Sequence, residues 1–208
     1  DRREALVKLQ ALDLKYPHRE DILRALTAWS QQLGQRTEQL YYCRKLVEAA
    51  PDDPEVWYYL GEAHLRCSQP VLARCAFQTA VSRWPDHEFA EGGRQMLAKI
   101  GQMLPSAVTY VPGLNEAERW ELAEAHERIM IDLHEGRLEQ VPGAAARLLA
   151  KWPTFIPARN NAAEAQFHLG RLPEAIAIAQ ETVRLFPDNA YALASLIRFL
   201  TLGGNEEQ

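Results

Sequence analysis

Apolar residues recur along most of this 208-residue chain every three or four positions, which is the period of a helix with one buried face. Leu40, Cys43 and Leu46 form one such stripe and predict a helix over residues 37–49. The same period returns in nearly every part of the chain. It predicts a protein in which about two-thirds or more of the residues are helical and in which no sheet forms.

The predicted helices are short and paired, because the apolar stripes are interrupted at regular intervals. Gly34 directly follows one stripe, and glycine is the usual left-handed residue that ends a helix. We expect the chain to turn over at the corresponding places in later pairs, near Ser68, Gly136 and Gly170.

Prolines give this pairing a fixed length. Pro17, Pro51 and Pro85 are 34 residues apart, and so are Pro153 and Pro187, with two such periods between Pro85 and Pro153. An internal repeat of this length is the signature of an array of stacked supersecondary units.

The stretch Pro54–His87 carries the remaining regularly spaced residues of the period. They are Trp57, Leu60, Gly61, His64, Ala73, Phe77 and Pro85. They fit the pattern W-x2-L-G-x2-Y, then A-x3-F, then P, with His64 in place of Tyr. The stretch therefore resembles a tetratricopeptide repeat (TPR). The resemblance implies an all-α, TPR-type solenoid of helical hairpins, a right-handed superhelix of about four to six full or partial repeats.

The period divides the chain into two stacks of repeats. The first, 1–103, comprises a half repeat 1–19, repeats 20–53 and 54–87, and a degenerate helix 88–103. The second, 115–208, comprises repeats 122–155 and 156–189 and a terminal helix 190–202.

Between the stacks, residues 104–114 depart from the helical pattern. Pro112-Gly113 and several β-branched residues disfavour a helix there, so we expect an irregular linker or hinge. Regularity returns at Asn115, an N-cap residue followed three positions later by Glu118. This pair predicts one long helix over 116–134.

Charge excludes some classes of partner. The net charge of −5 argues against a nucleic-acid surface, which normally needs a clustered basic face. Residues 1–103 balance 14 acidic with 14 basic side chains, whereas residues 104–208 carry 14 acidic and 9 basic ones. The whole excess of negative charge thus lies in the second half.

The three cysteines, Cys43, Cys67 and Cys75, fall inside predicted helices and show no metal-binding spacing. They favour a reducing compartment, so a cytoplasmic location is expected. No apolar run reaches the ~20 residues of a membrane span. The chain opens D-R-R-E without Met or a signal peptide, which indicates a piece of a longer protein.

Catalytic, metal and cofactor motifs are absent from the sequence. No nucleophile elbow, zinc-protease motif or phosphate-binding loop occurs, so no catalytic residue, cofactor or enzyme activity is predicted. His126, His134 and His168 invite a metal interpretation. Neighbouring repeats place equivalent residues roughly 10 Å apart, however, which is too far for them to share an ion.

The resemblance also implies where a partner would bind. In proteins of this family the first helix of each repeat lines the concave side, and positions near its start and one and two turns later face the ligand. Carried over to this sequence, the partner-binding residues are Arg24, Tyr58, Glu62, Arg66, His126, Met130, His134, Asn160, Asn161, Glu164, His168 and Arg198.

Two aromatic residues stay open between alternatives. Tyr58, beside Glu62 and Arg66, is either an exposed anchor for a partner or a helix-face side chain covered by its neighbours. Trp120 lies outside the repeat pattern, so core packing and an interface role are both open.

Some members of the family grip a C-terminal carboxylate with Lys, Arg and Asn from three successive first helices. Asn161 matches the central Asn of that clamp. The flanking positions offer His126 and Met130 on one side and Tyr191 and Ser195 on the other. Because these residues lack the required charge, chaperone-tail binding is not expected.

The sequence therefore predicts a non-catalytic scaffold that binds a protein or peptide segment in a concave groove. The alternative is a recruiting or regulatory TPR arm of a larger, bacterial enzyme or assembly complex. Self-association through an uncapped end of the repeat stack is a third reading.

Overall fold

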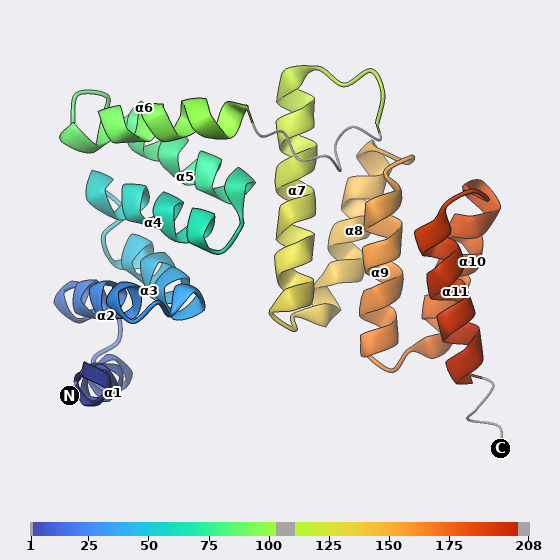
Figure 1. Ribbon diagram of the computed structural model, residues 1–208, viewed down its shortest axis with the longest axis horizontal. Helices are drawn as coiled ribbons and strands as arrows, with labels where there is room; N and C mark the ends of the chain where they lie inside the picture. Colours follow the sequence, from blue (N-terminus) through green and yellow to red (C-terminus); the bar gives the residue numbers. More distant parts are fainter. Residues whose placement is uncertain (1, 103–110, 204–208) are drawn as a thin grey trace. The chain divides into compact units, whose positions relative to one another are not determined.

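The computed structural model describes residues 2–102 and 111–203. Within these ranges the chain forms eleven α-helices and one short 3-10 helix, and no strand (Figure 1). The predicted all-α architecture is confirmed. None of the helices in the described part combines the length and apolar character needed to cross a bilayer.

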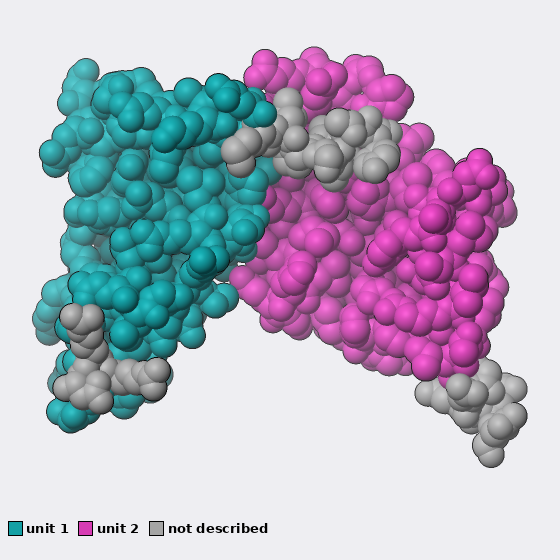
Figure 2. Space-filling model, in the orientation of Figure 1, with its two compact units in different colours: residues 1–104 teal, residues 105–208 magenta. Residues whose placement is uncertain are grey.

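The chain divides into two compact units, Asp1–Leu104 and Pro105–Gln208, coloured separately in Figure 2. Unit 1 contains helices α1 Arg2–Lys15, α2 Glu20–Gln32, α3 Arg36–Ala49, α4 Pro54–Arg66, α5 Pro70–Arg83 and α6 Glu88–Gly101. Unit 2 contains α7 Glu116–His134, the 3-10 helix η2 Leu138–Gln140, α8 Val141–Lys151, α9 Ile156–His168, α10 Leu172–Leu185 and α11 Ala190–Gly203.

The expected linker 104–114 falls for the most part outside the described residues. Its last four residues precede α7, with a turn at Pro112-Gly113. Asn115 then caps α7 as its sequence predicts. The Asn115 side chain accepts from the Glu118 amide at 3.0 Å, and the Glu118 carboxylate accepts from the Asn115 amide at 2.9 Å.

Successive helices turn over where the sequence predicts. Gly34, Gly136 and Gly170 have φ of 71°, 74° and 75°, in the left-handed region that glycine occupies without a steric cost. Ser68 takes the same conformation with φ 59°, although it carries a side chain. These four residues close the α2–α3, α4–α5, α7–α8 and α9–α10 pairs.

The core of unit 1 is aromatic where the helices of repeat 54–87 cross. Phe77 on α5 is fully buried and lies against Gly61 on α4, where a Cβ would stand only 2.6 Å from its ring. Gly61 is therefore required for the close approach of α4 and α5. Tyr58 extends the cluster, with its ring centroid 5.4 Å from that of Phe77.

Where α9 crosses α10, the core of unit 2 is built from alanines instead. Ala163 on α9 packs with Ala175 and Ala179 on α10, and all three are buried. Fully buried Phe199 on α11 closes this cluster, and its ring stacks on Phe167 at a centroid distance of 5.0 Å. Small residues on both helices allow close packing here without a glycine.

Trp120, left open by the sequence, belongs to the core. Its side chain on α7 is only 6% exposed, so it is not available as a surface anchor. Its helix begins before the repeat pattern does, which is why the period alone could not assign it.

Candidate interaction site

All twelve residues predicted to contact a partner lie on first helices of the helical pairs, namely α2, α4, α7, α9 and α11. In unit 1, Arg24 is held in ion pairs and Tyr58 is packed between helices, whereas in unit 2 most of the predicted residues contact one another.

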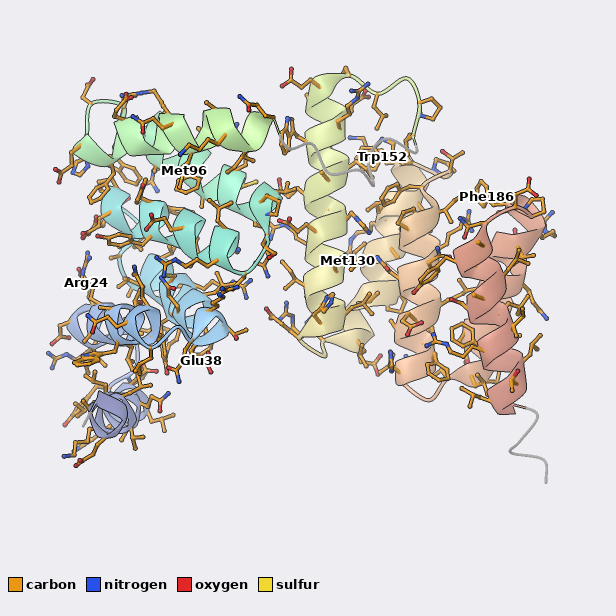
Figure 3. The ribbon with its side chains drawn as sticks, in the orientation of Figure 1. Arg24, Glu38, Met96, Met130, Trp152 and Phe186 are labelled. Carbon is orange, nitrogen blue, oxygen red and sulfur yellow. The ribbon has the colours of Figure 1, made fainter. Side chains whose placement is uncertain are left out.

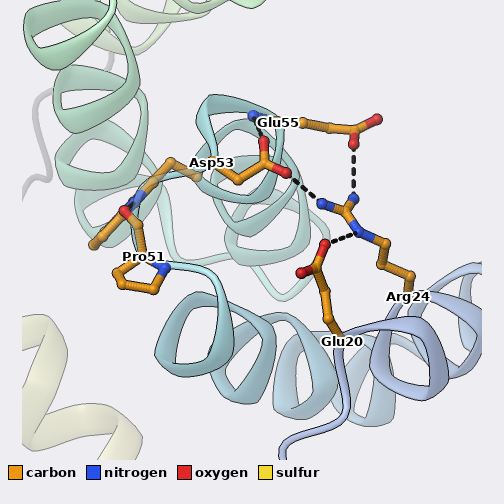
Figure 4. Close-up of polar contacts among 6 residues, drawn as sticks. Glu20, Arg24, Pro51, Asp53 and Glu55 are labelled. Atoms are coloured by element: carbon orange, nitrogen blue, oxygen red, sulfur yellow. Dashed lines mark hydrogen bonds and ion pairs between the residues drawn. The ribbon is translucent and has the colours of Figure 1, made fainter.

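Arg24 on α2 is held by three carboxylates (Figure 4). Its Nε donates to Glu20 at 2.8 Å, its Nη1 donates to Glu55 at 2.7 Å, and its Nη2 bonds to Asp53. Asp53 also caps α4 by accepting from the Glu55 amide at 2.9 Å. Arg24 thus joins two consecutive repeats, and a partner would have to compete with these bonds.

Tyr58 on α4 is covered by neighbouring helices. Its ring lies 5.3 Å from Phe89 on α6, and Gly92 on α6 leaves room for it, since a Cβ there would stand 3.1 Å from the ring. Burial, with a smaller contribution from the Glu62 charge, raises the pKa of the Tyr58 phenol. These contacts favour the packing interpretation of Tyr58 over the anchor interpretation.

Glu62 and Arg66 lie one turn apart on α4. Burial raises the pKa of the Glu62 carboxyl, and the charge of Arg66 partly offsets this. Arg66 Nη1 donates to Gln39 Oε1 over a long 3.4 Å, and Gln39 Nε2 donates to Gln31 at 3.4 Å. These contacts connect α4 to α3 and α2 at one end of the helix pairs.

In unit 2, Asn161 on α9 reaches two residues of α7. Its amide nitrogen donates to His126 Nε2 at 3.2 Å and to Met130 Sδ at 3.4 Å (Met130 is labelled in Figure 3). The His126 ring packs edge-on against buried Phe155 at 5.0 Å. Burial lowers the pKa of His126 to about 4, so the ring is neutral at pH 7 and its Nε2 can accept.

A second group joins α9 to α11. Glu164 accepts from His168 Nε2 at 3.1 Å, and its other oxygen is paired with Arg198. The guanidinium of Arg198 also lies over the Phe167 ring, 4.9 Å from its centroid. One oxygen of the Glu164 carboxylate is thereby bonded to the imidazole of His168 and the other to the guanidinium of Arg198.

His134 lies at the end of α7, where its Nδ1 donates to the Met130 carbonyl oxygen at 2.6 Å and its side chain is exposed. Asn160 is half-buried on α9, next in sequence to Asn161. His134 and Asn160 flank the two groups just described.

The first-helix side chains of unit 2 are mixed in chemical type. Among the described residues, no three His, Cys, Asp or Glu side chains gather as a metal ion would require. What unit 2 offers is a strip of amide, imidazole, carboxylate and guanidinium groups from α7, α9 and α11. We call His126, Met130, Asn161, Glu164, His168 and Arg198 the unit 2 strip.

The sequence interpretation missed Gln39. It is only 2% exposed, at a position one period before Ala73 and three periods before Val141, both of which are buried as well. A glutamine at a repeat position that is otherwise small and apolar is the signal that could have drawn attention to it.

Comparison with known proteins places the chain among repeat proteins. The family model described as tetratricopeptide repeat matches residues 38–88 and 133–190, which together make up just over half of the chain. No curated protein sequence matches the chain.

Solved structures of TPR proteins resemble it at low identity. The TPR domain of P58(IPK) aligns over 100% of this chain at 11% identity and a TM-score of 0.49, and this chain spans 62% of that domain. The TPR2AB domain of yeast Sti1, solved in complex with pHSP90, aligns over 97% of this chain and 77% of its own at 15% identity and TM-score 0.41.

YrrB, a TPR protein described as having an unusual peptide-binding site, aligns over 90% of this chain and 96% of its own at 15% identity and TM-score 0.38. The family model, the 34-residue period and the helical pairs agree with one another. The chain belongs to the tetratricopeptide repeat family.

Proposed function

We propose that this protein is a non-catalytic scaffold that binds a segment of a partner protein along the first helices of unit 2. The observation that carries the proposal is the unit 2 strip, in which side chains from three successive first helices are linked across one face. Two TPR proteins of similar fold are described by a peptide-binding site and by a complex with a protein. We propose that this chain likewise binds a peptide or protein segment.

The strip is preorganised for recognition. Glu164 is only 19% exposed, whereas Arg198 and His168 are 44% and 52% exposed, so the carboxylate holds two partly exposed side chains in place. Groups that are already fixed lose less conformational entropy when a partner binds, which raises affinity without new contacts. Asn161 is held in the same way by its contacts with α7.

The partner segment is proposed to be basic. Residues 104–208 carry all of the chain's excess negative charge, while the strip itself balances Glu164 against Arg198. Charge would therefore act mainly by speeding the encounter, and the hydrogen-bonding groups would select the partner. Binding should weaken as salt rises, because exposed charges are screened beyond about 10 Å at 0.1 M salt.

The test is capture of partners from a lysate of the source cells with a matched set of variants. Glu164→Ala/Arg198→Ala removes one ion pair from the first-helix face. Glu181→Ala/Arg184→Ala removes one from α10, where the two side chains pair at 2.7 Å, so both variants keep the net charge. We expect the first variant to lose its partners, quantified by mass spectrometry, and the second to keep them.

The opposite result would show that the partner uses the second-helix face. Circular dichroism on both variants checks that neither has lost helix content. Capture with Asn160→Ala/Glu164→Ala extends the test to the flanking residue Asn160, and the same loss is expected there.

A second candidate is that the chain is a recruiting arm of a larger enzyme or assembly complex. The supporting observation is the apolar face of α11, where Leu193, Ile197 and Leu200 are 37%, 64% and 48% exposed. Burying such a face gains about 25 cal/mol per Å². Sedimentation of the purified chain distinguishes the readings: a monomer leaves this face for another protein, whereas a dimer indicates self-association.

A further inference from the structure

A hollow of about 500 Å³ lies in unit 1 beside the C-terminal ends of α2 and α4, where the chain turns from each first helix into the second helix of its pair. Its lining residues are Gly34, Arg36, Gln39, Leu65, Arg66 and Ser68. The only charged side chains among them are two arginines. We propose that this hollow is a second binding site, which receives a side-chain carboxylate from an acidic protein segment.

The two arginines differ from most others of unit 1. Arg19 pairs with Asp21, Arg24 with three carboxylates, and Arg83 with Asp52 at 2.5 Å. Within the part of the chain that the structure describes, neither Arg36 nor Arg66 lies within ion-pair distance of a carboxylate, and both are exposed. A guanidinium presents a planar fork of donors that matches a carboxylate with two parallel hydrogen bonds.

Gln39 forms the floor between them. It is almost fully buried where the corresponding residues of other repeats are Ala73, Val141 and Ala175, all apolar. Burying an amide costs free energy unless it is hydrogen-bonded, and its bonds to Gln31 and Arg66 are both long at 3.4 Å. Arg66 has further N–H groups beside the one that donates to Gln39, so a carboxylate can bind the guanidinium without taking this bond from the buried amide.

Local charge selects the carboxylate over a more highly charged anion. Glu62 lies one turn before Arg66 on α4, and its charge already interacts with that arginine. Two positive guanidinium groups and one negative carboxylate nearby leave a net local charge of +1. A single bound carboxylate would neutralise this charge, whereas a phosphate dianion would leave a net negative charge. Leu65 supplies an apolar wall for the methylene groups of the entering side chain.

The site is independent of the proposed function. It lies wholly in unit 1 and uses residues of α3, α4 and their turns, whereas the unit 2 strip uses α7, α9 and α11. Either can fail without the other, because the experiments use different variants and different ligands.

The experiment titrates the full chain, labelled with ¹⁵N-arginine, with blocked tri-glutamate and blocked tri-glutamine peptides. The Nε–H signals of Arg36 and Arg66 are expected to shift to saturation with tri-glutamate, at least tenfold tighter than with tri-glutamine. Arg36→Gln/Arg66→Gln should abolish the binding. Arg19→Gln/Arg94→Gln removes the same charge from the same unit, at arginines already paired with Asp21 and Glu91, and should leave binding unchanged.

Two further arms keep the proposal falsifiable. Arg36→Lys/Arg66→Lys retains the charge but not the fork, and should weaken the binding of tri-glutamate severalfold without abolishing it. Inorganic phosphate should bind more weakly than the peptide. Equal binding of both peptides, tighter binding of phosphate, or equal loss in the Arg19/Arg94 control would each overturn the proposal.

Discussion

The two units repeat the same helical pair but use their first-helix side chains differently. In unit 1, Arg24 is surrounded by carboxylates and Tyr58 is enclosed between α4, α5 and α6. In unit 2, Asn161 and Glu164 reach across to neighbouring first helices, while the side chains of His168 and Arg198 stay partly exposed. Equivalent repeat positions thus join neighbouring repeats through carboxylates and buried rings in unit 1, and through partly exposed polar side chains in unit 2.

Packing at the helix crossings also differs between the units. Large rings at the α4–α5–α6 crossing of unit 1 fill the space between helices and bring first-helix residues into the packing. At the α9–α10 crossing of unit 2 the buried residues are the alanines Ala163, Ala175 and Ala179, and the polar side chains of α9 are not part of this cluster. Predictions that compare the units test this account directly.

The largest effect is expected from Phe77→Ala in unit 1. Phe77 is fully buried against Gly61 and Tyr58, and truncating a buried aromatic side chain costs about 3–5 kcal/mol of unfolding free energy. Urea denaturation followed by circular dichroism measures the cost. Phe89→Ala, at a partly exposed ring of the same cluster, is the control and should cost less. A Phe77 cost below about 1 kcal/mol would contradict the aromatic-core account.

The next effect is a pH dependence that belongs to unit 2. Because burial lowers the pKa of His126 from 6.5 to about 4, the unfolded chain takes up a proton there before the folded chain does. Unfolding free energy should therefore fall as the pH is lowered from 6.5 toward 4, by up to about 3 kcal/mol from this group.

The matched variant is His126→Gln, which removes the titrating ring. Urea denaturation at pH 7, 5.5 and 4.5 should show a shallower loss of stability for the variant than for the wild-type chain. Parallel pH profiles for the two proteins would mean that His126 is solvated rather than buried against Phe155.

A third prediction tests the helix crossing in unit 1. A Cβ at Gly61 would lie 2.6 Å from the Phe77 ring, so Gly61→Ala forces the ring or the helices to shift. Overpacking of this kind costs about 1–3 kcal/mol. Gly101→Ala, where nothing lies within 4 Å of the added carbon, should be neutral or slightly stabilising. Equal effects at Gly61 and Gly101, measured by thermal unfolding, would refute the requirement for glycine at the crossing.

Most of the fold could be predicted because the regular spacing of a repeat marks where each helical pair begins and ends. The 34-residue spacing of the prolines and the left-handed turns at Gly34, Ser68, Gly136 and Gly170 depend only on local chain geometry. The stripe of α3 was also correct, since Leu40, Cys43 and Leu46 are at most 2% exposed. These features do not depend on which residues lie opposite a helix, but only on the burial of one of its faces.

The contacts of the candidate site could not be predicted in the same way. Asn161 meets His126 and Met130 across 35 and 31 residues, and the pairing depends on side-chain rotamers and on how α7 crosses α9. Spacing placed these residues on one face but gave no partner for any of them. The hollow beside Gln39 could not be predicted from the sequence for a related reason, because it is formed by two turns that belong to different repeats.

The smallest predicted effect is the pH dependence of stability that comes from Glu62 in unit 1. Its sign is opposite to that of the His126 effect. Burial raises the pKa of Glu62, so the folded chain holds a proton there at a higher pH than the unfolded chain does. Its charged form at pH 7 is a cost to the fold, and this cost disappears as the pH falls through the raised pKa. Glu62→Gln should therefore stabilise the protein at pH 7 by less than about 1 kcal/mol and have little effect near pH 4, as measured by urea denaturation. A variant that is destabilised at pH 7 would show that the pairing of Glu62 with Arg66 outweighs the burial of its charge. That result would also weaken the anion site, because Arg66 would then be committed to Glu62 rather than available to a ligand.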